Sequence, residues 1–261
     1  MISKVVNSMT SIPIDVLRLI LEHVSEVDLL AICLVNKICC SCSQDVLYRN
    51  IQVHIFPKST RICQCLAQST HLARRVRSFA ISINEPELRG ALHNMTLLRN
   101  LSLPGFTDLN ILDGCTFKLV SFQCYVLESQ PLHRFLDSQP SLTDITLAAF
   151  SHCFPDFSAT CLPNLTRVTA NFSWLPQLIP NRPVSEVTSF GSTDGEESVD
   201  FSFFTLSTVP IQKFTVDFSH LYPKSGQLLA SIFPSLTYIK ITAYVSFLFI
   251  QSVRGPPSIF I

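Results

Sequence analysis

Cysteine and histidine are the residues of this chain with the greatest potential for chemistry, and the sequence has ten cysteines and seven histidines. The pairs Cys39-x-x-Cys42 and Cys63-x-Cys65 lie about twenty residues apart and could together supply four zinc ligands. Without a secretory signal, scattered cysteines do not indicate a disulfide framework. Cysteine also behaves as a small buried hydrophobe, and these positions fit helix interiors. We therefore interpret the cysteines as packing residues and predict no metal and no cofactor.

Sequence motifs of catalytic sites are missing. The chain has no glycine-rich phosphate loop, no G-x-S-x-G elbow and no H-E-x-x-H pair. Its histidines are spread without ligand spacing, at positions 23, 54, 71, 93, 133, 152 and 220. We therefore predict that the protein is not an enzyme and that it acts by binding.

The composition indicates a globular chain of 261 residues with no net charge. Hydrophobic residues make up 47% and charged residues 15%, which excludes a disordered or fibrous class. Lys+Arg and Asp+Glu both number 19, so no global field would attract nucleic acid or an anionic membrane. Only the basic run Arg74, Arg75 and Arg77 departs from this balance, and we interpret it as a solvated helix end.

Targeting and membrane signals are also missing from the sequence. The first residues lack the apolar core and cleavage site of a signal peptide. No stretch reaches the roughly 18 consecutive apolar residues that a membrane-spanning helix needs. We therefore expect a cytoplasmic or nuclear protein with no nucleic-acid partner and no membrane partner.

The first fifty residues have the spacing of three helices. The apolar residues of the first helix recur on one face of a 3.6-residue period: Leu17, Ile20, Leu21 and Val24. Ser11 is its expected cap and Pro13 lies in its first turn. A second helix is predicted to begin at Asp28 as N-cap, and a third to run from about Cys39 to Tyr48. Three short helices cannot enclose a full core, so some of their apolar surface should meet the rest of the chain or a partner.

From residue 76 onward a six-residue frame recurs, with the pattern apolar-x-x-apolar-x-apolar. Its eight copies begin at Val76, Leu98, Leu119, Leu142, Leu165, Val184, Ile211 and Leu236. Three copies share a similar start, in "PSLTDI", "PNLTRV" and "PSLTYI". A self-similar period of about 20 to 29 residues is typical of a leucine-rich-repeat solenoid. The pattern predicts one short strand per repeat, stacked into a curved parallel sheet.

Residues between the framed apolar positions share the opposite face of each strand, because side chains alternate along a strand. We expect them to form one continuous polar face on the concave side of the array, which would hold a protein substrate. An ordinary solvated sheet face without a ligand is the alternative. The predicted substrate-binding residues are Gln123, Tyr125, Asp144, Arg167, Asn171, Lys213, Asp217, Tyr238 and Lys240.

Residues 12–53, "IPIDVLRLILEHVSEVDLLAICLVNKICCSCSQDVLYRNIQV", resemble the F-box motif. The motif has a hydrophobic-Pro-x-acid start, a Leu/Ile face, an acid-Leu second start, a Val-x-Lys/Arg turn and a Leu-aromatic-Arg close. The matching segments here are Ile12-Pro13-Ile14-Asp15, Asp28-Leu29, Val35-Asn36-Lys37 and Leu47-Tyr48-Arg49. The segment departs from the common pattern in four ways: Ile12 replaces Leu, Asp15 replaces Glu, Tyr48 replaces Trp, and the aromatic residue often found just after the basic turn is absent from "KICC".

An F-box followed by irregular leucine-rich-like repeats is similar to the fungal-type substrate receptors of SCF cullin ubiquitin ligases. The resemblance implies that the helices bind the SCF adaptor protein, and through it a cullin. It also implies that the repeats hold an unknown protein substrate for ubiquitin-dependent degradation. The adaptor-binding residues implied are Ile12, Pro13, Asp15, Val16, Leu17, Ile20, Leu21, Leu29, Leu30, Val35 and Lys37.

The predicted fold class is α/β, with a short N-terminal three-helix F-box followed by an irregular leucine-rich-repeat-like solenoid that has a curved parallel sheet. The domains are an F-box at 10–53, a helical linker at 54–75 and a solenoid of about eight repeats at 76–261. The apolar ending, 245–261, lacks the polar outer face of a terminal repeat, so we expect the array to be truncated or to continue in a partner. The alternative function is a non-catalytic leucine-rich-repeat interaction scaffold whose N-terminal helices only cap the solenoid.

Overall fold

The structure is a computed structural model of the full chain, and it divides into two compact units. Unit 1 comprises residues 1–98 with 115–117, and unit 2 comprises residues 99–114 with 118–261. The residues that the structure describes are 12–53, 58–82, 86–105, 108–126, 129–149, 157–158, 160–190, 200–217 and 230–242. Within these ranges, no helix has both the length and the apolar character needed to cross a membrane.

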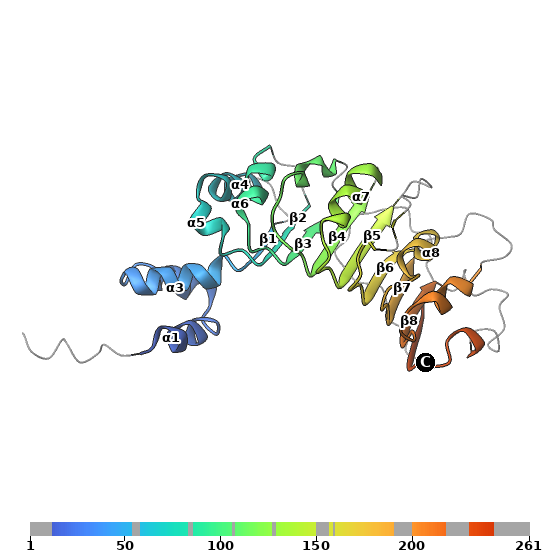
Figure 1. Ribbon diagram of the computed structural model, residues 1–261. Helices are drawn as coiled ribbons and strands as arrows, with labels where there is room; N and C mark the ends of the chain where they lie inside the picture. Colours follow the sequence, from blue (N-terminus) through green and yellow to red (C-terminus); the bar gives the residue numbers. More distant parts are fainter. Residues whose placement is uncertain are drawn as a thin grey trace, which may run out of the picture. The chain divides into compact units, whose positions relative to one another are not determined.

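Unit 1 begins with three helices, α1 (Ile14–Leu21), α2 (Glu26–Ile32) and α3 (Lys37–Leu47) (Figure 1). The second helix does not begin at Asp28 as predicted, because Ser25 is its N-cap. The Ser25 hydroxyl accepts a hydrogen bond from the Asp28 N–H and donates one to the Asp28 carboxylate. Asp28 therefore lies in the first turn, where a carboxylate complements the helix dipole.

The caps of the other two helices also differ from the prediction. Asn36 caps α3 through a 2.8 Å hydrogen bond that its Oδ1 accepts from the Cys39 N–H, so this helix begins two residues before Cys39. Pro13 precedes α1 as its N-cap residue, while Ser11 lies outside the described residues. In each case a side chain or a fixed proline dihedral, rather than the apolar period, sets where the helix starts.

The rest of unit 1 contains, in chain order, β1 (Asn50–Val53), α4 (Lys58–Gln68), α5 (Thr70–Ala73), β2 (Ser78–Ile81) and α6 (Leu88–Asn94). The last helix packs closely against α4, since a Cβ on Gly90 would lie 3.3 Å from the Ala67 Cβ. The Asn94 side chain donates to the Leu66 and Ala67 carbonyls at the end of α4. Both helices therefore form one layer of this unit.

The described residues of unit 2 contain seven strands: β3 (Asn100–Leu103), β4 (Ser121–Val126), β5 (Asp144–Ala149), β6 (Arg167–Asn171), β7 (Glu186–Phe190), β8 (Lys213–Asp217) and β9 (Tyr238–Thr242). Figure 1 shows the strands of this unit side by side in chain order. Helices and 3-10 turns connect them: η2 (Leu109–Leu112), α7 (Ser129–Asp137), η3 (Phe172–Trp174), α8 (Leu175–Leu178) and η4 (Ser202–Leu206). Each strand pairs in parallel with the next, which confirms the predicted parallel α/β sheet.

All eight predicted frames contain a strand, and each strand begins at the third residue of its frame. The third residues also pair with one another across unit 2, in the row Asn100, Ser121, Asp144, Arg167, Glu186, Lys213 and Tyr238. The first residues of the frames from Val76 to Ile211 are all buried, whereas Leu236 is only half-buried. The apolar frame therefore predicted both the strands and their register.

A ninth frame, which the sequence analysis missed, begins at Tyr48 in the sequence "YRNIQV". Its strand is β1, which pairs in parallel with β2 from Asn50↔Ser78 to Val53↔Ile81. Ile51 and Val53 are buried, as the frame requires. The series of strands therefore begins before residue 76, inside the segment that resembles the F-box.

A buried arginine organises the turns between strands in unit 2. Arg182 is 1% exposed, and its guanidinium donates to the backbone carbonyls of Cys161 (2.8 Å), Gln177 (2.7 Å), Pro180 (3.1 Å) and Ser158 (3.0 Å). Charge-assisted hydrogen bonds of this kind are stronger than neutral ones and satisfy a charge that would otherwise be costly to bury.

We expect Arg182→Lys to lower the free energy of unfolding by about 2–4 kcal/mol, because an ammonium group cannot reproduce the fork of four hydrogen bonds. Urea unfolding of the full chain, followed by circular dichroism, measures the change. Arg99→Lys is the matched control, since Arg99 is exposed in the same unit. Equal unfolding midpoints for Arg182→Lys and the wild type would contradict the assignment.

Candidate functional site

The three N-terminal helices share a small core of their own. Leu21, Leu29 and Cys42 are buried there, and partly buried apolar residues pack around them: Leu17, Val24, Ile32, Val46 and Leu47. Leu21 and Leu29 were expected on the contact face, but the structure places both in this core. Both leucines therefore stabilise the three helices from within. The prediction differed because the periodicity of a helix identifies an apolar face and does not show whether a core or a partner covers it.

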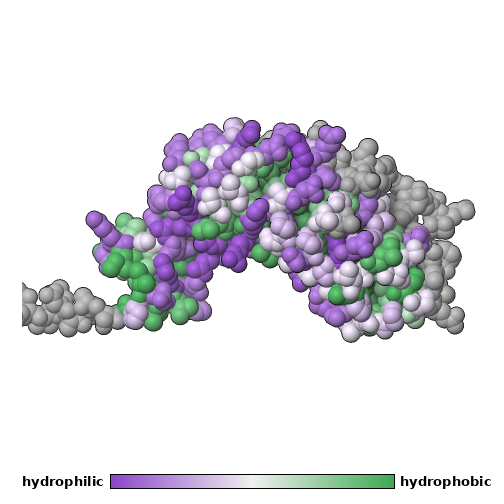
Figure 2. Space-filling model, in the orientation of Figure 1, coloured by the Kyte–Doolittle hydropathy of each residue, from purple (hydrophilic) through white to green (hydrophobic). Residues whose placement is uncertain are grey.

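Many hydrophobic residues of the same three helices are exposed outside this core. Ten large hydrophobic residues between positions 12 and 38 are exposed, with Leu34 at 88%: Ile12, Ile14, Val16, Leu19, Ile20, Val27, Leu30, Leu34, Val35 and Ile38. Only seven other large hydrophobic residues in the described ranges are exposed. Figure 2 shows hydrophobic surface gathered over α1 and α3. An apolar patch of this density indicates a binding surface, which we call the apolar face.

Most of the predicted adaptor-binding residues lie at the surface in this region. The exposed ones are Ile12, Pro13, Asp15, Val16, Ile20, Leu30, Val35 and Lys37. Leu17 is half-buried against the core. Five members of the apolar face were not predicted from the sequence: Ile14, Leu19, Val27, Leu34 and Ile38. The signal for Ile14 and Leu19 was that "IDVLRLIL" is apolar on nearly every side, so one stripe alone could not be its only contact.

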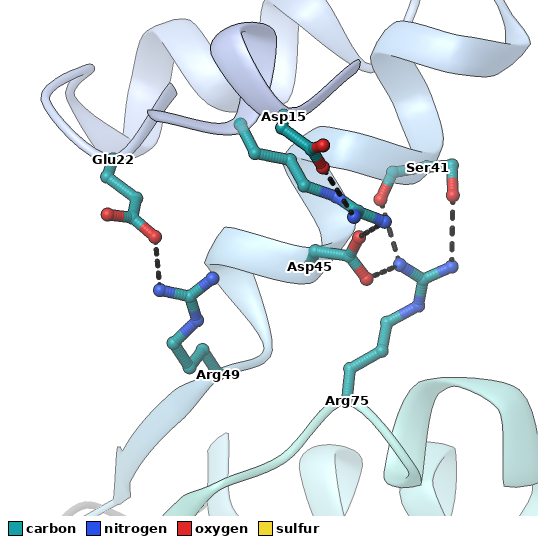
Figure 3. Close-up of polar contacts among 7 residues, drawn as sticks. Asp15, Glu22, Ser41, Asp45, Arg49 and Arg75 are labelled. Carbon is teal, nitrogen blue, oxygen red and sulfur yellow. Dashed lines mark hydrogen bonds and ion pairs between the residues drawn. The ribbon is translucent and has the colours of Figure 1, made fainter. Parts of the chain in front are cut away.

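Arginines tie α1 and α3 to each other and to later segments of unit 1 (Figure 3). Asp45 of α3 pairs with Arg75, and at 3.0 Å with Arg18 of α1. Arg75 also donates to the Ser41 carbonyl at 2.8 Å. The interpretation of the basic run as a solvated helix end was therefore wrong for Arg75. Its guanidinium is held by α3, a contact between residues about 30 positions apart that no local pattern indicates.

Three of the five charged residues predicted to hold a substrate form, together with Glu186, an ion-pair ladder across four neighbouring strands of unit 2. Arg167 lies 2.6 Å from Asp144 and 3.0 Å from Glu186, and Lys213 lies 2.7 Å from Glu186. Glu186 was not among the predicted residues, although it occupies the same frame position as the other three. Hydrogen bonds from Lys213 and Arg167 lower the pKa of the Glu186 carboxyl. The ladder neutralises its own charges.

The remaining predicted substrate-binding residues have different surroundings. Gln123 accepts a hydrogen bond from the Ser102 hydroxyl, while Asn171 and Lys240 are half-buried. Asp217 pairs through its backbone with Thr242, and its side chain lies outside the described residues. Tyr125 and Tyr238 are exposed at 36% and 45%. Among the described residues of the polar face, these tyrosines are the large exposed aromatic side chains.

The cysteines show no sign of a metal site in the part of the chain that the structure describes. No three His, Cys, Asp or Glu side chains there come together in a way that could hold a metal ion. Cys42 and Cys63 are buried, whereas Cys39 and Cys65 are partly exposed. Burial also raises the pKa of the Cys124 thiol, and raises that of Cys161 to about 12, so both stay protonated at neutral pH.

Glu186→Gln should lower the folding stability by about 0.5–1 kcal/mol at neutral pH, because it removes the ion pairs with Arg167 and Lys213. The effect is small because both basic side chains are 54% exposed and solvent screens their charges. The lowered pKa sets the sign of the pH dependence. The stabilisation is complete above the ordinary glutamate pKa of about 4.3 and is lost as the pH falls through the lower folded-state value. Thermal unfolding between neutral and acidic pH measures both effects.

A double-mutant cycle with Lys213→Gln isolates the ladder from other effects of the substitution. The two changes should be less than additive, and the coupling should shrink at about 1 M salt. Strict additivity at low salt would show that the ladder does not stabilise the sheet.

Comparison with known proteins identifies the N-terminal helices. Residues 9–50 match the F-box domain family, and this range contains α1, α2 and α3 with their core and the apolar face. No curated protein matches the chain. The F-box domain points to an adaptor-binding role in an SCF-type ubiquitin ligase. The chain therefore contains an F-box domain at residues 9–50.

Proposed function

We propose that this protein is the substrate-recognition subunit of an SCF-type cullin ubiquitin ligase. The apolar face carries the proposal, because its ten exposed hydrophobic residues all lie within the segment that matches the F-box domain. Its F-box binds the adaptor and through it a cullin, while the polar sheet face of the leucine-rich-repeat-like array binds a protein substrate. Such a receptor acts in the cytoplasm or nucleus.

The proposed mechanism needs no catalytic residue on this chain. Binding holds a substrate lysine close to a ubiquitin-charged enzyme elsewhere in the assembly, which raises its effective concentration. In this arrangement the receptor contributes affinity and orientation, and the transfer chemistry takes place on other subunits.

The adaptor contact is proposed as helices docked in an apolar groove. Val16 and Ile20 lie one turn apart on α1 and are both exposed, so they share one side of this helix. Leu21 faces the opposite way, into the core, and holds the helix in place. A few anchors of this kind dominate most interfaces, each contributing about 2 kcal/mol or more.

The substrate contact is proposed to centre on the tyrosines of the polar face. Tyr125 and Tyr238 offer aromatic surface together with a hydroxyl, a combination that is enriched at binding hot spots. The ladder of Asp144, Arg167, Glu186 and Lys213 alternates in sign across the strands. It therefore favours a substrate segment of mixed or low charge over a strongly acidic or basic one.

The interaction scaffold is the second candidate. The Asp45–Arg75 contact favours it, because this contact links α3 to the segment that precedes β2, as an end cap would. Adaptor binding distinguishes the two candidates, since a scaffold that uses its helices only as a cap would not bind the adaptor.

Ile20→Asp should weaken adaptor binding by roughly 30-fold or more, since it places a charge within the apolar face. Titration of the purified full chain with an SCF adaptor, followed by calorimetry, measures the change. Leu206→Asp is the matched control, because Leu206 is 56% exposed and Ile20 is 48% exposed. Failure of the wild-type chain to bind, or equal binding by Ile20→Asp, would favour the scaffold.

Substrate recognition is tested by the double variant Tyr125→Ala, Tyr238→Ala in a reconstituted ubiquitination reaction with cell extract. Proteins that are ubiquitinated with the wild-type chain should lose the modification with this variant, because it removes both aromatic anchors. Leu206→Ala, which changes an exposed apolar residue of the same unit, should leave the pattern unchanged. The same set of ubiquitinated proteins with the tyrosine variant would exclude the polar face as the substrate site.

A further inference from the structure

Unit 1 contains an arginine-lined cavity that the proposed function does not use. It has a volume of about 490 Å³ and is lined by Arg18, Ser41, Asp45, Arg49, His71, Arg74, Arg75 and Arg77. These residues come from α1, α3, α5 and the segments that follow α3 and α5, and all belong to unit 1. The volume is typical of a site for a small molecule.

Three of the arginines are held in place by acceptors on neighbouring segments (Figure 3). Arg18 and Arg75 share the Asp45 carboxylate, and Arg49 pairs with Glu22. A fourth, Arg77, donates to the Arg74 carbonyl at 2.8 Å. A ligand would therefore meet guanidinium groups whose positions are largely set, which reduces the entropy lost on binding.

The positive charge of the cavity is only partly compensated. Asp45 is the single carboxylate among the lining residues, against five arginines. Within the described residues, neither Arg74 nor Arg77 has a carboxylate partner. The Nε atoms of Arg18 and Arg75 are buried without a hydrogen-bond partner. Like charges gathered at one site repel, so an anion of two or more charges would stabilise this arrangement.

We propose that this cavity binds a small phosphate-bearing anion that carries two or more negative charges. A planar guanidinium group binds two phosphate oxygens through two parallel hydrogen bonds. A phosphate-bearing anion has enough oxygens to bind several arginines in this way at once, whereas a single carboxylate has only two. Because the lining residues come from the helices and from the segment after α5, the bound anion would join these parts of unit 1 and stabilise them together. The proposal stands independently of the adaptor and substrate assignments.

Calorimetric titration of the full chain with sodium tripolyphosphate, in about 150 mM NaCl, tests the proposal. We expect saturable binding at one site per chain and a higher Tm in the presence of the anion. The double variant Arg74→Gln, Arg77→Gln should weaken binding at least tenfold. Neither residue forms an ion pair within the described part of the chain, so the fold should persist, which circular dichroism checks.

The matched control is the double variant Arg61→Gln, Arg89→Gln, which removes the same charge from exposed positions of unit 1 outside the cavity. This control should bind tripolyphosphate within about twofold of the wild type, and citrate should bind the wild type at least tenfold more weakly. Absence of saturable binding, equal weakening by the control variant or equal affinity for citrate would overturn the proposal. Tighter binding of a phosphoserine peptide than of tripolyphosphate would also overturn it, in favour of a phosphorylated protein segment.

Discussion

The in-register stacking of short parallel strands is the constraint on which the rest of this structure depends. In unit 2 the carbonyl of the second residue of one frame accepts hydrogen bonds from the second and third N–H groups of the next frame, as Val120 does from Thr143 and Asp144. The same pattern recurs at every step from Arg99 to Tyr238. A slip of one residue would turn the apolar side chains outward, because side chains alternate along a strand. The buried columns, the row of charges and the exposed tyrosines all follow from this register.

Arg49 shows how the F-box and the strand series are combined within unit 1. Its carbonyl accepts hydrogen bonds from the Arg77 and Ser78 N–H groups, which is the stacking pattern of unit 2. Its guanidinium pairs with Glu22, directly after α1. The last residues of the F-box motif are therefore also the first frame of the array. An F-box built in this way has no flexible linker between its helices and its first strand.

The charges of the arginines are balanced at one place in this molecule and left in excess at another. On the sheet face, Arg167 lies between Asp144 and Glu186, so its charge is balanced by neighbours in the same row. In the cavity of unit 1 the arginines outnumber the carboxylates, and a positive excess remains. The chain as a whole has 19 basic and 19 acidic residues, which conceals this difference. Local balance, rather than net charge, determines which surface can attract an anion.

The sequence predicted eight of the nine described strands, because an apolar frame of six residues is a local signal of burial that each repeat carries alone. It also identified the F-box segment and the approximate place of its three helices. The fold determines that Leu21 lies in a core while Ile20 lies at the surface, since helix periodicity does not show what covers an apolar face. Only the tertiary structure joined Glu186 to Arg167 and Arg75 to Asp45, about 20 and 30 positions away. Ion pairs between distant residues follow from how the chain stacks, and no local pattern contains that information.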